Sequence, residues 1–149
     1  MQLSGVEARR RLTAARVVRL ATADAEGVPH LVPATFVVHD DTILIAVDSK
    51  PKRHRNLRRL RNVAENPYVC VLADQYDDDW TQLWWARGDG IAQILADAPP
   101  ADALPAKVPP ADAPLDRLVA KYPQYREHRP DGPVLAIHVT RWSGWSYAS

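Results

Sequence analysis

Short runs of apolar and β-branched residues, separated by turn residues, dominate the chain and predict a mostly β protein. The turn residues Asp24 to Gly27 predict a hairpin, and His39-Asp40-Asp41 predicts a second turn. The run from Thr42 to Val47 is apolar after its first residue, so we expect this strand to be buried on both faces. The pattern predicts strands over residues 17–22, 28–38, 42–47, 68–73, 83–95 and 134–139.

Three segments show a spacing typical of helices. A Ser-x-x-Glu capping box predicts a helix over residues 4–15. An apolar stripe among basic residues, opened by Pro51, predicts a helix over residues 51–64. Residues 115–122 predict a third, short helix.

Two features interrupt these elements. Gly88 and Gly90 fall inside the run 83–95, which favours a bulge or bend in that strand. Between residues 98 and 114 six prolines alternate with alanines, a composition that prevents a continuous helix and predicts an irregular surface connection. Because closing a sheet removes its exposed edges, we expect a six-stranded antiparallel barrel flanked by two or three helices.

Composition supports one globular domain over residues 1–149. The chain is 46% apolar and has a formal net charge of +1, which argues against a general nucleic-acid binder. Cys70, the lone cysteine, lies in an apolar run and is predicted to be a buried structural thiol. The arginines near the N-terminus are not followed by an apolar segment, so we expect neither a signal peptide nor a membrane span. We therefore expect the protein to be cytoplasmic.

Positive charge is concentrated where the third predicted strand enters the second helix. A helix N-terminus offers free amides and a partial positive charge, so basic residues there favour a phosphate or carboxylate site. The alternative is a solvated basic face, which we favour for the last three residues of the cluster. Seven cations lie within twelve residues: Lys50, Lys52, Arg53, Arg55, Arg58, Arg59 and Arg61.

Three tryptophans, Trp80, Trp84 and Trp85, lie within six residues. They suit either a stacking wall for a planar ligand or packing in a core or interface, and residue type alone favours packing. The preceding carboxylates, 77–79, lack the spacing of a calcium loop, and we expect a solvated or capping loop. No metal site is predicted, because no two histidines have metal-ligand spacing.

The order of these segments resembles the pyridoxamine 5′-phosphate oxidase-like split β-barrel superfamily, and within it the actinobacterial branch that uses the deazaflavin coenzyme F420. The resemblance covers nearly the whole chain. It rests on Leu20-Ala21-Thr22, on residues 26–33, on residues 50–57, on Asn66-Pro67, and on Asp79-Trp80 before Leu83-Trp84-Trp85.

The resemblance implies an FMN-binding type of split barrel that forms a homodimer and transfers hydride between F420 and a small organic substrate. The family's basic strand-to-helix turn binds the cofactor phosphate, and its second and third strands lie beside the ring. Trp80 matches an aromatic position that reaches the cofactor across the dimer, and Trp85 is a looser match. Carried over, the cofactor-binding residues are His30, Val32, Pro33, Val47, Lys50, Lys52, Arg53, Arg55, Asn56, Trp80 and Trp85.

Other functions remain open at this stage. The arginine-rich segment suits the long anionic tail of F420, but the same fold binds FMN in oxidases and reductases. A protein that binds a deazaflavin, or another anionic planar ligand such as haem, without turnover also fits. The sequence identifies neither a catalytic side chain nor the substrate.

Overall fold

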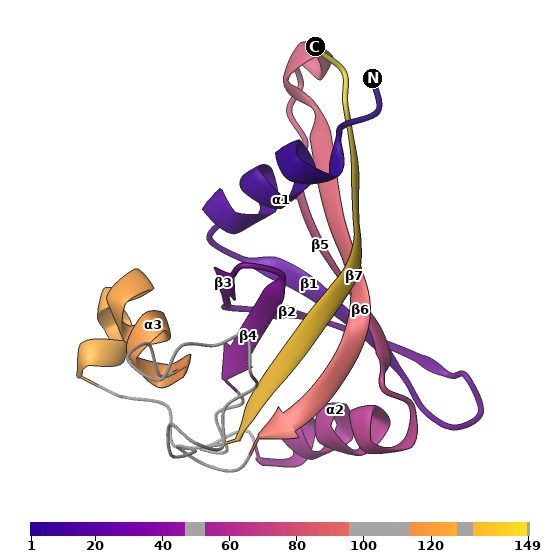
Figure 1. Cartoon of the computed structure of the whole chain (residues 1–149), viewed down its shortest axis with the longest axis vertical. Helices are drawn as coiled ribbons and strands as arrows, with labels where there is room; N and C mark the ends of the chain where they lie inside the picture. Colours follow the sequence, from indigo (N-terminus) through magenta and orange to yellow (C-terminus); the bar gives the residue numbers. More distant parts are fainter. Residues whose placement is uncertain (47–52, 96–113, 128–132, 149) are drawn as a thin grey trace.

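The computed structural model describes residues 1–46, 53–95, 114–127 and 133–148. Within these ranges the chain forms one antiparallel sheet of seven strands, in the order β2-β1-β5-β6-β7-β4-β3 (Figure 1). The strands are β1 (Val18–Ala23), β2 (Pro29–Ala34), β3 (Val37–His39), β4 (Thr42–Ala46), β5 (Tyr68–Gln75), β6 (Trp84–Leu95) and β7 (Val134–Ser146). This curled sheet is the expected split-barrel fold.

Helices cover the sheet at three places: α1 (Gly5–Ala14), α2 (Arg53–Glu65) and α3 (Pro114–Lys121), with 3-10 turns η1 (Trp80–Gln82) and η3 (Pro123–Arg126). The predicted cap of α1 is confirmed, since Ser4 Oγ accepts the Glu7 amide at 3.1 Å. No helix in the described ranges is long and apolar enough to cross a membrane. The predicted proline-rich connection lies outside the described residues, except for its last residue, which begins α3.

One predicted strand is divided in the structure. Residues 28–38 were expected to form a single strand, but Thr35 and Phe36 separate β2 from β3, and this raises the strand count from six to seven. β2 and β3 lie at opposite ends of the strand order, yet only these two residues join them. The sheet therefore curls until its two edges meet at this corner.

The tyrosine hydroxyl of Tyr122, just after α3, holds that corner. The Phe36 amide donates to it at 3.0 Å, and the hydroxyl lies 2.9 Å from the carbonyl oxygens of both Phe36 and Arg16. Phe36 itself is fully buried, so its amide has no access to water. The division of the predicted strand is thus stabilised by a residue 86 positions away.

We expect Tyr122→Phe to destabilise the fold by about 1–3 kcal/mol, because the variant leaves the buried Phe36 amide without an acceptor. Chemical denaturation followed by fluorescence measures the change. Tyr76→Phe is the matched control, since its ring is exposed. Equal midpoints for the two variants would show that the Tyr122 hydroxyl does not hold the corner.

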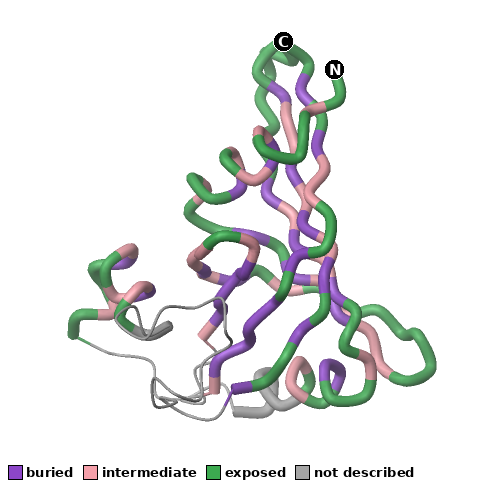
Figure 2. The backbone as a smooth tube through the Cα atoms, in the orientation of Figure 1, coloured by how far each residue is buried: buried purple, intermediate pink, exposed green. Residues whose placement is uncertain are grey.

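Two apolar clusters lie on either side of β4. Ile43 and Ile45 belong to the main core beneath α1, whereas Leu44 packs with Leu118 and Tyr122. Figure 2 shows the buried residues following the central strands, and the exposed ones at the β1–β2 hairpin and the upper tip. The prediction that this strand is buried on both faces is confirmed.

The glycine signals in β6 are also confirmed as a bulge. The register with β7 shifts between Asp89 and Gly90. A Cβ atom at Gly90 would lie 2.3 Å from the His138 carbonyl oxygen, so the two backbones approach closely here.

The cysteine of β5, Cys70, is half-buried rather than buried as predicted. Val69 and Val71 face the core, and the alternation of side chains along the strand turns the Cys70 thiol outward. Burial still raises the pKa of this thiol.

Candidate cofactor-binding site

A buried polar contact fixes α2 on the sheet. Asn62 Nδ2 donates to Thr22 Oγ1 at 3.0 Å, and these residues are 3% and 4% exposed. Residues three and four positions earlier in a helix lie on the same side, so Arg58 and Arg59 share this face with Asn62. Thr22 is paired directly with His30 across the β1–β2 ladder. The contact therefore joins the predicted basic helix to the predicted ring-binding strand.

His30 lies half-buried on the core side of β2. Burial, together with the positive charges of Arg58 and Arg59, lowers the pKa of its imidazole below the ordinary value, with burial the larger cause. Its Nδ1 atom is buried and has no hydrogen-bond partner within the described part of the chain. A neutral imidazole is thus favoured, with one ring nitrogen available to a ligand.

The basic residues of α2 divide into two groups. Arg58 and Arg61 are exposed, as predicted. The same prediction was wrong for Arg59, which is half-buried, and burial lowers the pKa of its guanidinium. Arg59 lies one turn before both buried residues, Asn62 and Val63, whereas Arg58 lies one turn before the exposed Arg61 as well as Asn62. The buried Asn62-Val63 pair is the signal that sequence reasoning missed.

The remaining predicted anion-binding residues lie at the start of the helix. Arg53 opens α2, and Arg55 and Asn56 follow in its first turns, so the helix amides and their partial positive charge lie where predicted. The structure describes the backbone of these residues but not their side chains. Val47, Lys50 and Lys52 fall outside the described residues.

A hollow of about 260 Å³ beside the β1–β2 turn does not suit an anion. It is lined by two guanidiniums, Arg58 and Arg61, and by three carboxylates, Asp24, Glu26 and Glu65. The acidic side chains outnumber the basic ones, so this hollow repels a phosphate. Asn62, which contacts Thr22, also lines this hollow. The predicted anion-binding region is therefore limited to the first turns of α2 and the Arg59 side of the helix.

The predicted ring-binding residues of β2 do not all share a face. Val32 packs against the main core, and His30 points to the same side because alternate residues of a strand face one way. Pro33 points to the other side and is exposed. Within one chain, Pro33 therefore does not lie beside the site formed by His30 and α2.

The three clustered tryptophans also separate. Trp84 packs against the core and its Nε1 donates to Gln75 Oε1 at 3.1 Å, so the packing interpretation is confirmed for it. Trp85 consequently faces the opposite side, where the Arg87 guanidinium lies 5.7 Å from its ring. Trp80, in η1, is 68% exposed. β1 and β5 lie between β2 and β6, so one chain does not bring His30 and these two rings together.

The acidic loop before Trp80 is a capping loop, as predicted. Asp79 Oδ1 accepts the Thr81 amide at 3.1 Å, and Asp77 Oδ1 accepts the Asp79 amide at 2.8 Å. These bonds hold η1 and present Trp80 to solvent. Among the described residues no group of three or more His, Cys, Asp or Glu side chains is arranged to hold a metal ion.

The residues of this region fit a planar cofactor with an anionic tail. The unpartnered Nδ1 atom of His30 supplies a polar contact in a desolvated setting, and Arg59 beside it supplies a fixed positive charge. The start of α2 adds backbone amides. A ring at β2 and a phosphate at α2 would both find complementary groups.

Nearly the whole chain matches a known protein family. The family model described as pyridoxamine 5′-phosphate oxidase matches residues 6–146. A search of curated protein sequences finds no match. These results identify a family but no close characterised relative.

Solved structures with the same fold bind different ligands. An FAD-binding protein from Mesorhizobium loti is 22% identical, with a TM-score of 0.66 and coverage of 97% of this chain and 95% of its own. An FAD-binding protein from Mycobacterium smegmatis is 21% identical, with a TM-score of 0.61 and full coverage of both chains. The heme storage protein HutZ from Vibrio cholerae is 14% identical, with a TM-score of 0.64 and coverage of 95% and 92%. At these identities the likeness shows the fold alone.

Proposed function

The chain belongs to the pyridoxamine 5′-phosphate oxidase family, and on that premise we propose that it is an oxidoreductase that binds F420 and transfers hydride to or from a small organic substrate. One observation carries the proposal: the desolvated Arg59 guanidinium, in the interior of the basic helix α2, acts electrostatically on His30, whose Nδ1 atom has no hydrogen-bond partner in the described part of the chain. Four further cations, Lys50, Lys52, Arg53 and Arg55, precede Arg59 in the sequence, more than one phosphate needs, which supports a cofactor with a polyanionic tail.

In this proposal each group of residues has a distinct role. The anionic tail is bound by Lys50, Lys52, Arg53, Arg55 and Asn56. The ring packs against His30 and Val32 on the core side of β2. The bound cofactor supplies the hydride chemistry, and the protein orients the two reacting partners and excludes water. His30, neutral and half-buried, contributes a hydrogen bond rather than a charge.

We further propose that two copies of the chain form the complete site. Trp80, Trp85 and Pro33 lie away from His30 in one protomer, so a second protomer has to supply them if they contact the same cofactor. Exposed apolar side chains on the outer face of the sheet, Leu31 and Tyr68, support an interface there. If analytical ultracentrifugation shows a monomer at micromolar concentration, this part of the proposal is contradicted.

Flavin binding is the second candidate. Two structural neighbours are FAD-binding proteins, and the residues of β2 and α2 suit an isoalloxazine ring with a phosphate equally well. The heme storage protein among the neighbours supports a third candidate, a binding protein without turnover. For each of the three candidate functions we propose that the protein is cytoplasmic.

A titration of the purified protein with F420, FMN and FAD, followed by ligand fluorescence at low and moderate salt, tests the proposal. We expect F420 to bind most tightly, and its affinity to fall with salt because the tail is anionic. Preference for a flavin would move the assignment to the second candidate. Binding without oxidation of the reduced cofactor by any of a panel of enones and quinones would favour the third.

A further inference from the structure

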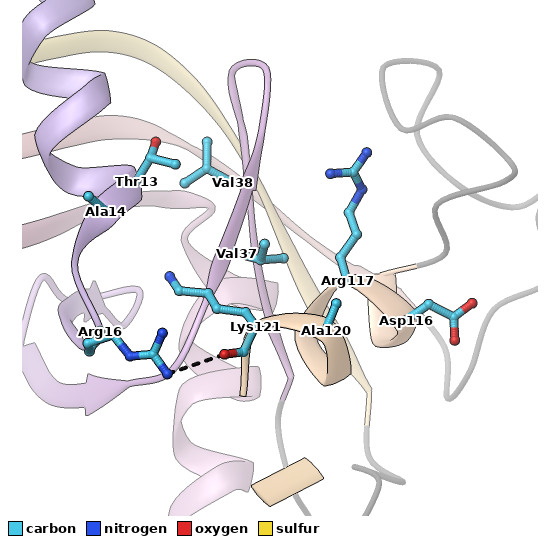
Figure 3. A pocket seen from close by; sticks show the side chains of 9 residues that line it. All are labelled: Thr13, Ala14, Arg16, Val37, Val38, Asp116, Arg117, Ala120 and Lys121. Carbon is cyan, nitrogen blue, oxygen red and sulfur yellow. Dashed lines mark hydrogen bonds between the residues drawn. The ribbon is translucent and has the colours of Figure 1, made fainter. Parts of the chain in front are cut away.

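A larger hollow lies away from α2, between the C-terminal end of α1, strand β3 and helix α3 (Figure 3). Its volume is about 620 Å³, within the range of small-molecule pockets. Val37 and Val38 of β3 and Ala14 of α1 contribute its apolar lining. The pocket shares no residue with the proposed cofactor site.

Charge is unevenly distributed along this pocket. Three cationic residues line it, Arg16, Arg117 and Lys121, against one carboxylate, Asp116. In Figure 3 the Lys121 side chain extends from α3 toward Ala14 and Arg16, whereas Asp116 lies at the far end. Arg16 and Lys121 therefore make one end of the pocket positive, whereas the other end holds one charge of each sign, Asp116 and Arg117.

The Lys121 amine is a buried polar group of this pocket. Its Nζ atom is buried and has no hydrogen-bond acceptor among the described residues. It lies 3.5 Å from the centre of the Phe36 ring and 5.2 Å from that of Tyr122. Burial, aided by the charge of Arg16, lowers the pKa of this amine to about 8. An ammonium group offers three donors, so the site lacks an acceptor that a ligand can supply.

The Arg16 guanidinium is fixed beside this amine. Its Nη2 donates to the Lys121 carbonyl oxygen at 3.2 Å, and it lies 5.2 Å from the centre of the Tyr122 ring. Arginine and lysine held together in this way attract a carboxylate more strongly than either does alone. The same Tyr122 that holds the β2–β3 corner thus also positions the positive end of the pocket.

We propose that this pocket binds an apolar molecule carrying a single carboxylate, with the carboxylate at Lys121 and Arg16 and the apolar part against Val37 and Val38. The pocket is a second ligand site, separate from the cofactor site at α2 and β2, and the proposal does not depend on which cofactor binds there.

Benzoate serves as the probe, and benzyl alcohol as its uncharged counterpart. The full chain is labelled with 13C at the Cε atoms of its lysines, and the Lys121 signal is identified by its absence in Lys121→Met. We expect benzoate to shift this signal saturably and to raise the pKa of the Lys121 amine, because an adjacent anion stabilises its charged form. Benzyl alcohol is expected to leave that pKa unchanged.

Variants provide the second readout, measured by calorimetric or NMR titration of benzoate. We expect Lys121→Met and Arg16→Gln each to weaken benzoate binding at least tenfold. The control, Arg141→Gln, changes an exposed residue of β7 and is expected to alter the benzoate affinity less than twofold. Equal affinity in Lys121→Met, or no binding to the native chain, would overturn the proposal. Displacement of benzoate by F420 or FMN would overturn the separation of the two sites. Benzoate binding without binding of any cofactor would refute the proposed function alone.

Discussion

Removing two cations at the start of α2, with Lys52→Ala and Arg53→Ala together, is expected to weaken F420 binding by about 100-fold. Arg53 is the first residue of the helix, and Lys52 precedes it in the sequence. Each charge-assisted hydrogen bond to an anionic tail contributes about 1.5–3 kcal/mol, so losing two removes at least about 3 kcal/mol. The affinity is measured by quenching of cofactor fluorescence at fixed ionic strength.

The matched control removes the same net charge elsewhere. Arg126→Ala with Arg141→Ala deletes two exposed arginines, one in η3 and one in β7. We expect this control to change F420 affinity less than threefold, since screened charges at a distance contribute little. A comparable loss in both double variants would mean that F420 responds to the total charge of the protein, and unchanged affinity in the first would refute the assigned tail site.

Gly90→Ala is expected to destabilise the fold by about 3 kcal/mol and to lower the Tm by about 10 °C. A Cβ atom at this position would lie 2.3 Å from the His138 carbonyl oxygen and 3.0 Å from Val139 Cα. Both contacts are with backbone, which cannot rotate away as a side chain can. Relieving these clashes requires the hydrogen-bonded ladder between the neighbouring strands β6 and β7 to separate at the bulge.

Gly5→Ala is the control for that substitution. Gly5 begins α1, and an added Cβ atom would meet Trp142 at 3.6 Å and beyond, which is ordinary van der Waals contact. Alanine also suits a helix better than glycine. We expect the Tm of this variant to equal or slightly exceed that of the native chain. If Gly90→Ala unfolds at the same temperature, the close approach of β6 and β7 is wrong.

The sequence predicted the features that depend on neighbouring residues. The α1 cap requires only Ser4 and the amide three residues later. The first hairpin turn follows from Asp24, whose Oδ1 accepts the amides of Glu26 and Val28, and from Gly27 with its φ of 81°. The bulge at Gly90 was marked by its missing side chain. Each of these signals is local, so each is readable along the chain.

Only the tertiary structure decided the features that depend on distant residues. β2 and β3 separate because Tyr122 bonds the Phe36 backbone from far along the chain, and the sequence around Phe36 reads as one continuous strand. Arg59 is buried because Asn62 reaches Thr22, and the same contact places α2 beside His30. The sequence determined the fold class, the local turns and the concentration of positive charge. The tertiary structure decided which of those charges lose water and which faces of the sheet the aromatic rings occupy, because burial is set by contacts between segments that the linear order does not bring together.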